Sequence, residues 1–291
     1  MVGIVLLASG LGVWGIVADR HHPPHANSRL FSTRDEGPPE VRELLERARL
    51  DSAPAVLLFD RASIPMYGIV VPGGDAIEIS DRLRHTEHAS HTPLVLGDGW
   101  DVRAHEDAAK ATIDSPHAII ERARAFDLDA WIARRLEEVA RELRTDISET
   151  WTPHGQEHER FRLIRDSALD VPRPSLVIAL IPTRASAESP AWLAFGNWRG
   201  CPEPTVHVAM LARWHEQYGA EVIGIGSDMI ELRVARPPTE RESAIAIARE
   251  HVAYAPSLLA GGTRSIVDIA ESIAGARVWS FRFRRNMAAN H

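Results

Sequence analysis

The stretch LVIALI, residues 176–181, is continuously apolar. A strand that is covered on both faces of a sheet has this pattern, whereas a half-exposed strand alternates between apolar and polar residues. We therefore expect residues 176–181 to form a central strand and the neighbouring elements to pack on both of its faces.

The sequence that follows this run predicts further strands and helices. A helix is expected from about Glu203 to Tyr218. The turn Gly226-Ser227-Asp228 predicts a hairpin between residues 221–225 and 229–234. The last strand should bury Trp279, Phe281 and Phe283 and turn Ser280, Arg282 and Arg284 to water. A strand over residues 191–195, a helix opened by a capping box at residues 239–242 and a helix over about 265–273 complete this half.

The first half has a less regular pattern. Helices are predicted after Pro38-Pro39, after Ser115-Pro116 and from Asp127 to about Arg144. Strands are predicted at residues 56–59, 67–71, 76–80 and 94–96. A polar connection from Trp151 to about Pro174 suggests a domain boundary. We expect an α+β protein: residues 1–37 form an apolar segment and linker, residues 38–150 a smaller α/β N-terminal region, and residues 172–287 a C-terminal domain with a mixed β-sheet and flanking helices.

The second half contains an ordered series of short motifs. It comprises Pro190-Ala191-Trp192, Phe195-Gly196-Asn197-Trp198, Cys201-Pro202-Glu203-Pro204, Arg213-Trp214-His215-Glu216, Ala235-Arg236-Pro237-Pro238 and Val278-Trp279. Over about residues 172–285 the chain resembles a bacterial family known as domain of unknown function 4253. The resemblance implies a shared fold and an intracellular, cytoplasmic protein, and it supplies no catalytic residues.

Composition excludes several classes of protein. The chain has 291 residues, 33 Lys+Arg and 40 Asp+Glu, and a net charge of −7, so we expect no nucleic-acid binding, which needs clustered positive charge. A single cysteine excludes an internal disulfide and a cysteine-based zinc cluster. The match Gly10-x-Gly12-x-x-Gly15 lacks a βαβ context, and no cofactor is expected.

Cys201 is the sharpest candidate for covalent chemistry. It precedes a predicted helix start, where the helix dipole lowers the pKa of a thiol, and His207 and His215 lie on that helix. A small buried cysteine is the more common outcome for such a position. His215 with Glu216 forms a second catalytic candidate.

The histidines at positions 85, 88 and 91, together with Glu87, resemble a metal-ligating set. Their spacing differs from the H-E-x-x-H of zinc proteases, and the segment has no strong helical pattern. We expect a solvated loop and no metal site.

Large aromatic and polar residues gather around a glycine-punctuated loop. Tryptophan and arginine dominate the energetics of protein interfaces, so this set suits a recognition surface, although a tryptophan cluster in the core explains the aromatic members equally. The candidate binding residues are Trp192, Asn197, Trp198, Arg199, Glu203 and Trp214.

Residues 2–18 carry no charge and allow two interpretations. Seventeen residues reach only the lower limit of a membrane-spanning helix, and no basic segment precedes them. They form either two short buried strands or a membrane anchor.

The sequence favours a non-enzymatic bacterial protein that binds another protein, with immunity proteins against bacterial toxins as one candidate type. The alternatives are a hydrolase or thiol-dependent enzyme that uses Cys201 or His215 and Glu216, and a membrane-tethered accessory protein.

Overall fold

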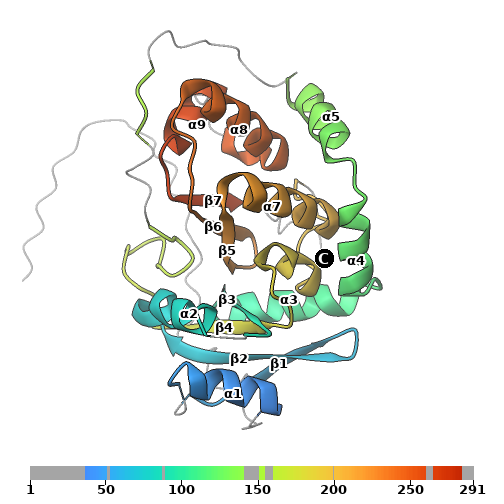
Figure 1. The fold of residues 1–291 in the computed structure, drawn as a ribbon, viewed down its shortest axis with the longest axis vertical. Coiled ribbons are helices and arrows are strands. Elements are labelled where there is room, and N and C mark those ends of the chain that lie inside the picture. The colour runs from blue at the N-terminus through green and yellow to red at the C-terminus, as the bar shows by residue number, and fades with distance from the viewer. Residues whose placement is uncertain are drawn as a thin grey trace, which may run out of the picture.

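Strand β4, Ser175–Ile181, lies in the interior of a single mixed sheet with the order β1-β2-β4-β3-β5-β6-β7 (Figure 1). The computed structural model describes residues 37–50, 53–86, 89–140, 151–154, 160–198, 200–259 and 265–283. Neighbouring strands are antiparallel except β3 and β5, which are parallel. The other strands are β1 Val56–Arg61, β2 Ile64–Pro72, β3 Thr92–Gly97, β5 Ala220–Ile225, β6 Met229–Val234 and β7 Val278–Arg282.

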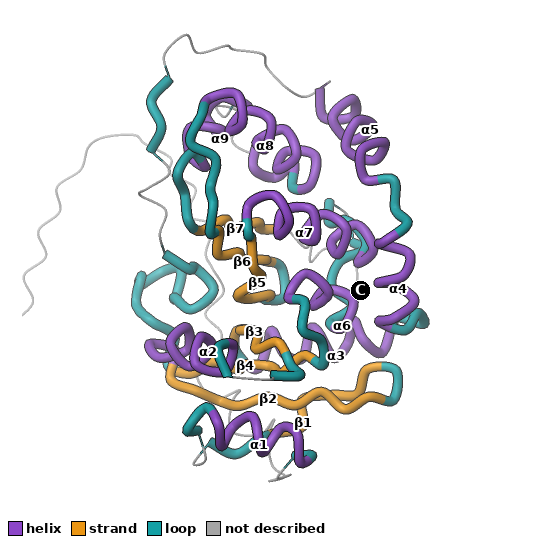
Figure 2. The backbone as a smooth tube through the Cα atoms, in the orientation of Figure 1, coloured by secondary structure: helices purple, strands orange, loops and turns teal. Residues whose placement is uncertain are grey.

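Helices cover the sheet on both faces (Figure 2). They are α1 Pro39–Arg47, α2 Ala76–Arg84, α3 Gly99–Ala111, α4 Pro116–Arg124, α5 Leu128–Ala140, α6 Ser189–Trp192, α7 Pro204–Tyr218, α8 Arg241–Tyr254 and α9 Ile266–Ile273. Short 3-10 turns occur at η2 Gly73–Asp75, η4 Ser186–Glu188 and η5 Pro256–Leu259. The α+β class with a mixed sheet and flanking helices is therefore confirmed.

The prediction of a central strand at residues 176–181 is confirmed by the alternation of its side chains. Leu176, Ile178 and Leu180 pack with α1 and α2 in one core cluster. Residues 177, 179 and 181 pack on the opposite face with side chains from α3, α5, α7 and α8. The run is apolar throughout because neither face of β4 meets water.

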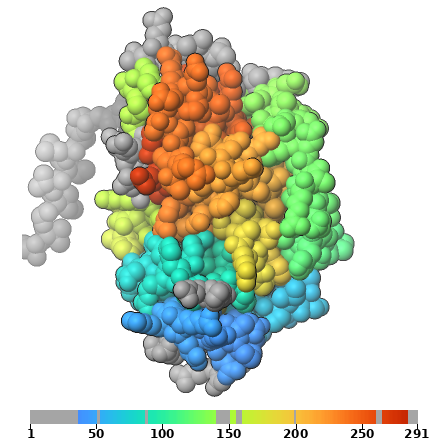
Figure 3. Space-filling view, viewed as in Figure 1, coloured from blue at the N-terminus to red at the C-terminus, as the bar shows by residue number. Residues whose placement is uncertain are grey.

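The sheet is continuous between the two halves of the sequence. β4, from the second half, pairs with β2 on one side and with β3 on the other, and β3 pairs in turn with β5. In Figure 3, the first described residues, in blue, form one end of the molecule, and residues from the later part of the chain, in orange, lie toward the other end.

Local sequence signals explain where several helices begin and end. The Ser115 side chain accepts from the backbone N–H of Ala118, as its N-cap position predicts. Ser265 and Asp268 form a capping box at α9. Gly219, with φ of 62°, ends α7 in the left-handed conformation that glycine adopts most easily.

Three local predictions were wrong. Residues 76–80 begin helix α2 instead of a strand, because Ala76, Ser80 and Leu83 share a buried helical face. Residues 191–195 continue from α6 into a buried turn, because Pro190 lies in the first turn of a helix. The capping box expected at residues 239–242 is not formed, since α8 takes Glu240 as its N-cap without a side-chain bond.

The two interpretations of residues 2–18 fall outside the described residues, as does the expected end of α5 near residue 144. Of the helices in the described part of the chain, none is long and apolar enough to cross a membrane.

Candidate functional site

The tryptophans expected in a recognition loop occupy the interior. Trp192 and Trp214 are buried, and Trp214 stacks on Phe281 with ring centroids 5.1 Å apart. Trp198 is half-buried against Phe195, with a centroid distance of 5.0 Å. Asn197 and Glu203 are exposed, whereas Arg199 lies outside the described residues. Of the candidate binding residues that are described, Asn197 and Glu203 thus reach the surface most fully.

Cys201 belongs to a buried polar chain. Its Sγ lies 3.3 Å from His207 Nε2, and His207 Nδ1 lies 2.6 Å from the hydroxyl of Tyr254. Complete burial lowers the pKa of His207 to about 3, although the Pro202 carbonyl opposes this shift, and burial together with Cys201 raises the pKa of Tyr254. A thiolate nucleophile beside an imidazolium requires a charged His207, which burial disfavours. This geometry supports a packing role for Cys201.

His215 and Glu216 are exposed near the end of α7, and His215 Nδ1 donates to the Ala220 carbonyl over 3.1 Å. His215 lines a cavity of about 660 Å³ between α2, β3, η4 and β5. The cavity, which we call the basic pocket, is also lined by His91 of the predicted histidine cluster. The residues that line it are Arg84, Thr86, Ala89, His91, Thr92, Pro93, Arg184, Ala185, Ser186, Ala187, His215 and Glu221.

The rest of the histidine cluster is dispersed or lies outside the described residues. His85 Nδ1 donates to the Asp81 carbonyl over 2.7 Å, and residues 87 and 88 are not described. Burial lowers the pKa of His91. Within the described ranges, the structure contains no group of three or more His, Cys, Asp and Glu side chains placed to hold a metal ion.

A second cavity, of about 330 Å³, lies along β7, and we call it the edge pocket. Side chains of α8, η5 and α9 line one part of it, and a loop before β4 contributes charged groups. The lining residues are Arg160, Arg162, Arg165, Asp170, His251, Leu258, Ile269, Ser272, Ile273, Val278, Trp279, Ser280 and Phe281.

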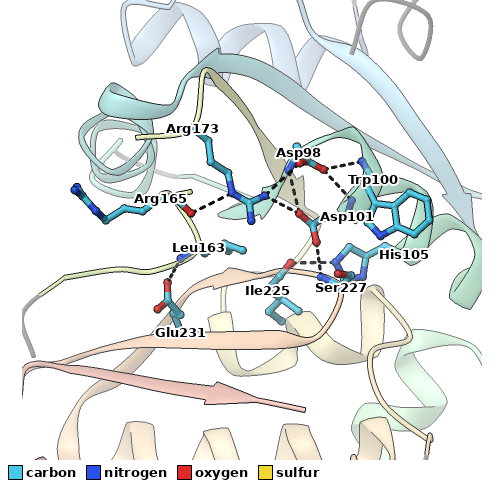
Figure 4. Close-up of polar contacts among 10 residues, drawn as sticks. All are labelled: Asp98, Trp100, Asp101, His105, Leu163, Arg165, Arg173, Ile225, Ser227 and Glu231. Carbon is cyan, nitrogen blue, oxygen red and sulfur yellow. Dashed lines mark hydrogen bonds and ion pairs between the residues drawn. The ribbon is translucent and has the colours of Figure 1, made fainter. Parts of the chain in front are cut away.

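The loop that carries these arginines is clamped onto the sheet by Glu231, which is buried on β6 (Figure 4). One carboxylate oxygen of Glu231 accepts from Arg162 N–H at 2.8 Å and from the Ser280 hydroxyl at 2.5 Å. The other oxygen accepts from Leu163 N–H at 2.9 Å. The clamp therefore fixes the backbone that presents the Arg162 side chain at the edge pocket.

A second clamp holds the other end of the same loop. Figure 4 shows Arg173 reaching between Asp98 and Asp101, with its Nη1 3.3 Å from a carboxylate oxygen of each. Asp101 also accepts from Ser227 N–H at 2.8 Å, which ties α3 to the β5–β6 turn. Gly97 permits this arrangement, because a Cβ there would lie 2.0 Å from an oxygen of Asp101.

One edge of β7 faces away from β6 in the described part of the sheet. Phe283 N–H donates to the Asp228 carbonyl and Val234 N–H donates to the Arg277 carbonyl. Because hydrogen-bonded pairs alternate in an antiparallel ladder, the amide groups of Val278 and Ser280 point away from β6. Both residues line the edge pocket, so the pocket contains backbone donors and acceptors.

Two buried polar side chains line the same pocket. His251 and Trp279 are each 2% exposed, and their ring centroids are 4.6 Å apart. His251 Nε2 and Trp279 Nε1 have no hydrogen-bond partner among the residues that the structure describes. Burial lowers the pKa of His251 to about 3, so its ring is neutral at pH 7.

Sequence reasoning missed the edge pocket because its members come from distant segments. The burial of Trp279, Phe281 and Phe283 was predicted and is confirmed. The polar connection at residues 151–174 was treated as a boundary, and the arginines at positions 160, 162 and 165 within it were the available signal.

Comparison with known families agrees with the sequence motifs. Residues 177–283 match the model of a family described as Domain of unknown function (DUF4253), which confirms the resemblance over the C-terminal part of the chain. No curated protein and no solved structure matches the chain. The matched segment contains β7 and α9 of the edge pocket, whereas the arginine loop precedes it.

Proposed function

We propose that the protein is a protein-binding module in which the edge pocket captures an extended, acidic segment of a partner protein. The observation that carries this proposal is the outward-facing edge of β7 inside a cavity lined by arginines. An extended peptide can add a strand to such an edge, and its main chain can pair with the outward backbone groups of Val278 and Ser280, which have no partner among the described residues. The Arg282 carbonyl, by contrast, already accepts from the Ser257 hydroxyl.

The charge around the edge pocket favours an acidic partner segment. Three arginines line it against a single carboxylate, Asp170, which is already engaged by Arg165 through a hydrogen bond of 2.6 Å. Arg162 is exposed and forms no ion pair with any described residue. In a chain with a net charge of −7, this local excess of positive charge would select the partner and orient it.

The buried end of the edge pocket offers specificity. Trp279 Nε1 is a hydrogen-bond donor, and a neutral His251 can either donate or accept. A partner side chain with an oxygen at this depth would satisfy a polar group that is otherwise costly to bury. Alternate side chains of an added strand point to the same face, so the amino-acid preference of the bound segment should repeat every two residues.

This proposal keeps the protein-binding function predicted from the sequence but changes the surface. An immunity protein of the type considered from the sequence would neutralise a basic toxin, whereas the edge pocket presents positive charge. The partner chemistry that we propose is therefore acidic at the contact.

Selection of peptides from a displayed random library, followed by fluorescence anisotropy, tests the proposal. Selected peptides should be rich in Asp and Glu, and N-methylation of alternate amides in one register should abolish binding while the other register is tolerated. Arg162→Glu should weaken binding about tenfold or more, and Arg134→Glu, an exposed charge reversal on α5, should leave it unchanged. Equal tolerance of both N-methylated registers would rule out strand addition.

A further inference from the structure

We infer that the basic pocket is a second, separate binding site, which takes a small oxyanion bearing a phosphate or carboxylate group. It shares no lining residue with the edge pocket, so the inference does not depend on the proposed function. The basic pocket lies where β3 and β5 begin, as shown by Thr92, Pro93 and Glu221 in its lining.

Arg84 is fixed at this pocket without being neutralised. Its side chain is 14% exposed, and Nη2 donates to the carbonyls of Pro93 at 3.0 Å and Val222 at 3.1 Å. The closest carboxylate oxygen, of Glu221, is 3.7 Å from Nη1, which is beyond hydrogen-bond distance. The Nε atom is buried and has no partner within the described residues. The guanidinium group is thus held in place with its charge only partly compensated.

Arg184 adds a second cation to the same pocket. It lies in the connection between β4 and η4, is exposed, and makes no ion pair with the described part of the chain. The exposed arginines of α4, by contrast, are paired, Arg122 with Asp114 and Arg124 with Glu121. An arginine at a pocket is suited to a planar oxyanion because its N–H groups bind two oxygens at once.

A buried hydroxyl gives an independent indication of a ligand. Ser186 is 8% exposed, and its oxygen accepts from Val222 N–H at 3.1 Å. Among the described residues its hydroxyl hydrogen has no acceptor, so it can be donated to a ligand oxygen in the basic pocket. His215 is oriented by the hydrogen bond that its Nδ1 donates to the Ala220 carbonyl, so Nε2 of the neutral ring is an acceptor and can contact only a protonated oxygen of the ligand.

Negative groups at the basic pocket must be outweighed by its arginines if an anion is to bind. Glu221 and the carbonyl ends of α2 and α7 oppose an anion. The attraction therefore has to come from Arg84 and Arg184 together, and loss of either charge should weaken binding. Arg84 also stabilises two carbonyls, so its substitution would confound folding with binding, and Arg184 is the residue to change.

Nuclear magnetic resonance of the full chain with inorganic phosphate tests this inference. The signals of His91, Ser186 and His215 should shift in a saturable manner, and Arg184→Gln should weaken the affinity about tenfold. Arg134→Gln provides a matched control on α5. Acetate and methylphosphonate distinguish a carboxylate site from a phosphate site. Shifts that are absent, or that sodium chloride reproduces at equal ionic strength, or that persist unchanged in Arg184→Gln, would overturn the inference.

Discussion

Around β2 and β4, the face toward α1 and α2 is packed with Val, Leu, Ile and Ala side chains, whereas the core around β6 and β7 contains aromatic rings and histidines. We call the first region the aliphatic end and the second the aromatic end. In the aromatic end, His251 lies within 5 Å of the rings of Trp214, Trp279 and Phe281. The aliphatic end contributes no side chain to the edge pocket. The aromatic end, by contrast, places buried polar atoms beside a strand edge, which is why we assign binding to it.

Removal of one large side chain from each end should separate stability from binding. Trp214→Ala should lower the free energy of unfolding by about 4 kcal/mol and Leu83→Ala by about 3 kcal/mol, since both side chains are completely buried. Urea unfolding measures both values. Only Trp214→Ala should also weaken peptide binding at the edge pocket, because it removes the packing behind His251. An equal loss of binding in Leu83→Ala, measured where both variants remain folded, would contradict the division of roles.

The next largest loss of stability should follow removal of the Glu231 hydrogen bonds that hold the loop at residues 160–165. Glu231→Gln keeps the size of the side chain but turns an amide hydrogen toward a backbone N–H, so at least one of three hydrogen bonds is lost. The free energy of unfolding should fall by about 2–3 kcal/mol, because hydrogen bonds to a charged group are the stronger kind. Hydrogen exchange should increase at Arg162 and Leu163. Unchanged exchange at these two amides would mean that Glu231 does not hold the loop.

The two ends also differ in how much of them the sequence could predict. The aliphatic end follows from periodicity, as β4 does, because its side chains alternate between two apolar faces. The edge pocket requires residues 160–165, His251 and Trp279 to meet, and their spacing in the chain contains no sign of that contact. The burial of Cys201 was expected as the commoner outcome, but its contact with His207 and Tyr254 depends on how α7 and α8 pack. Local patterns predict elements, whereas sites formed between elements need the fold.

Acid should weaken the aromatic end selectively. The pKa of His251 is lowered to about 3 by burial, so the unfolded chain binds a proton below about pH 6.5 that the folded chain does not. The free energy of unfolding is therefore unaffected by this histidine above pH 6.5 and falls as the pH is lowered toward 3. At pH 5 the loss is roughly 2 kcal/mol. His251→Phe should remove about half of the dependence measured by urea unfolding at pH 7.5 and pH 5, because burial also lowers the pKa of His207 to about 3 and this second histidine contributes the rest. His85→Phe, an exposed histidine beside the aliphatic end, provides the control, and a slope unchanged by His251→Phe would contradict the assignment.

The smallest effect concerns Cys201, and it distinguishes a packing role from a role as a nucleophile. Because Cys201 is only 8% exposed and lies beside a neutral His207, its alkylation should follow opening of the structure instead of titration of the thiol. The rate with iodoacetamide should therefore rise in mild urea and should show no extra reactivity at pH 6, where an imidazolium-paired thiolate would still react. Cys201→Ala should cost about 1 kcal/mol and leave both binding sites intact. Fast alkylation of the folded protein at pH 6 would instead support the thiol-dependent alternative, because only a thiolate stabilised within the fold could react under those conditions.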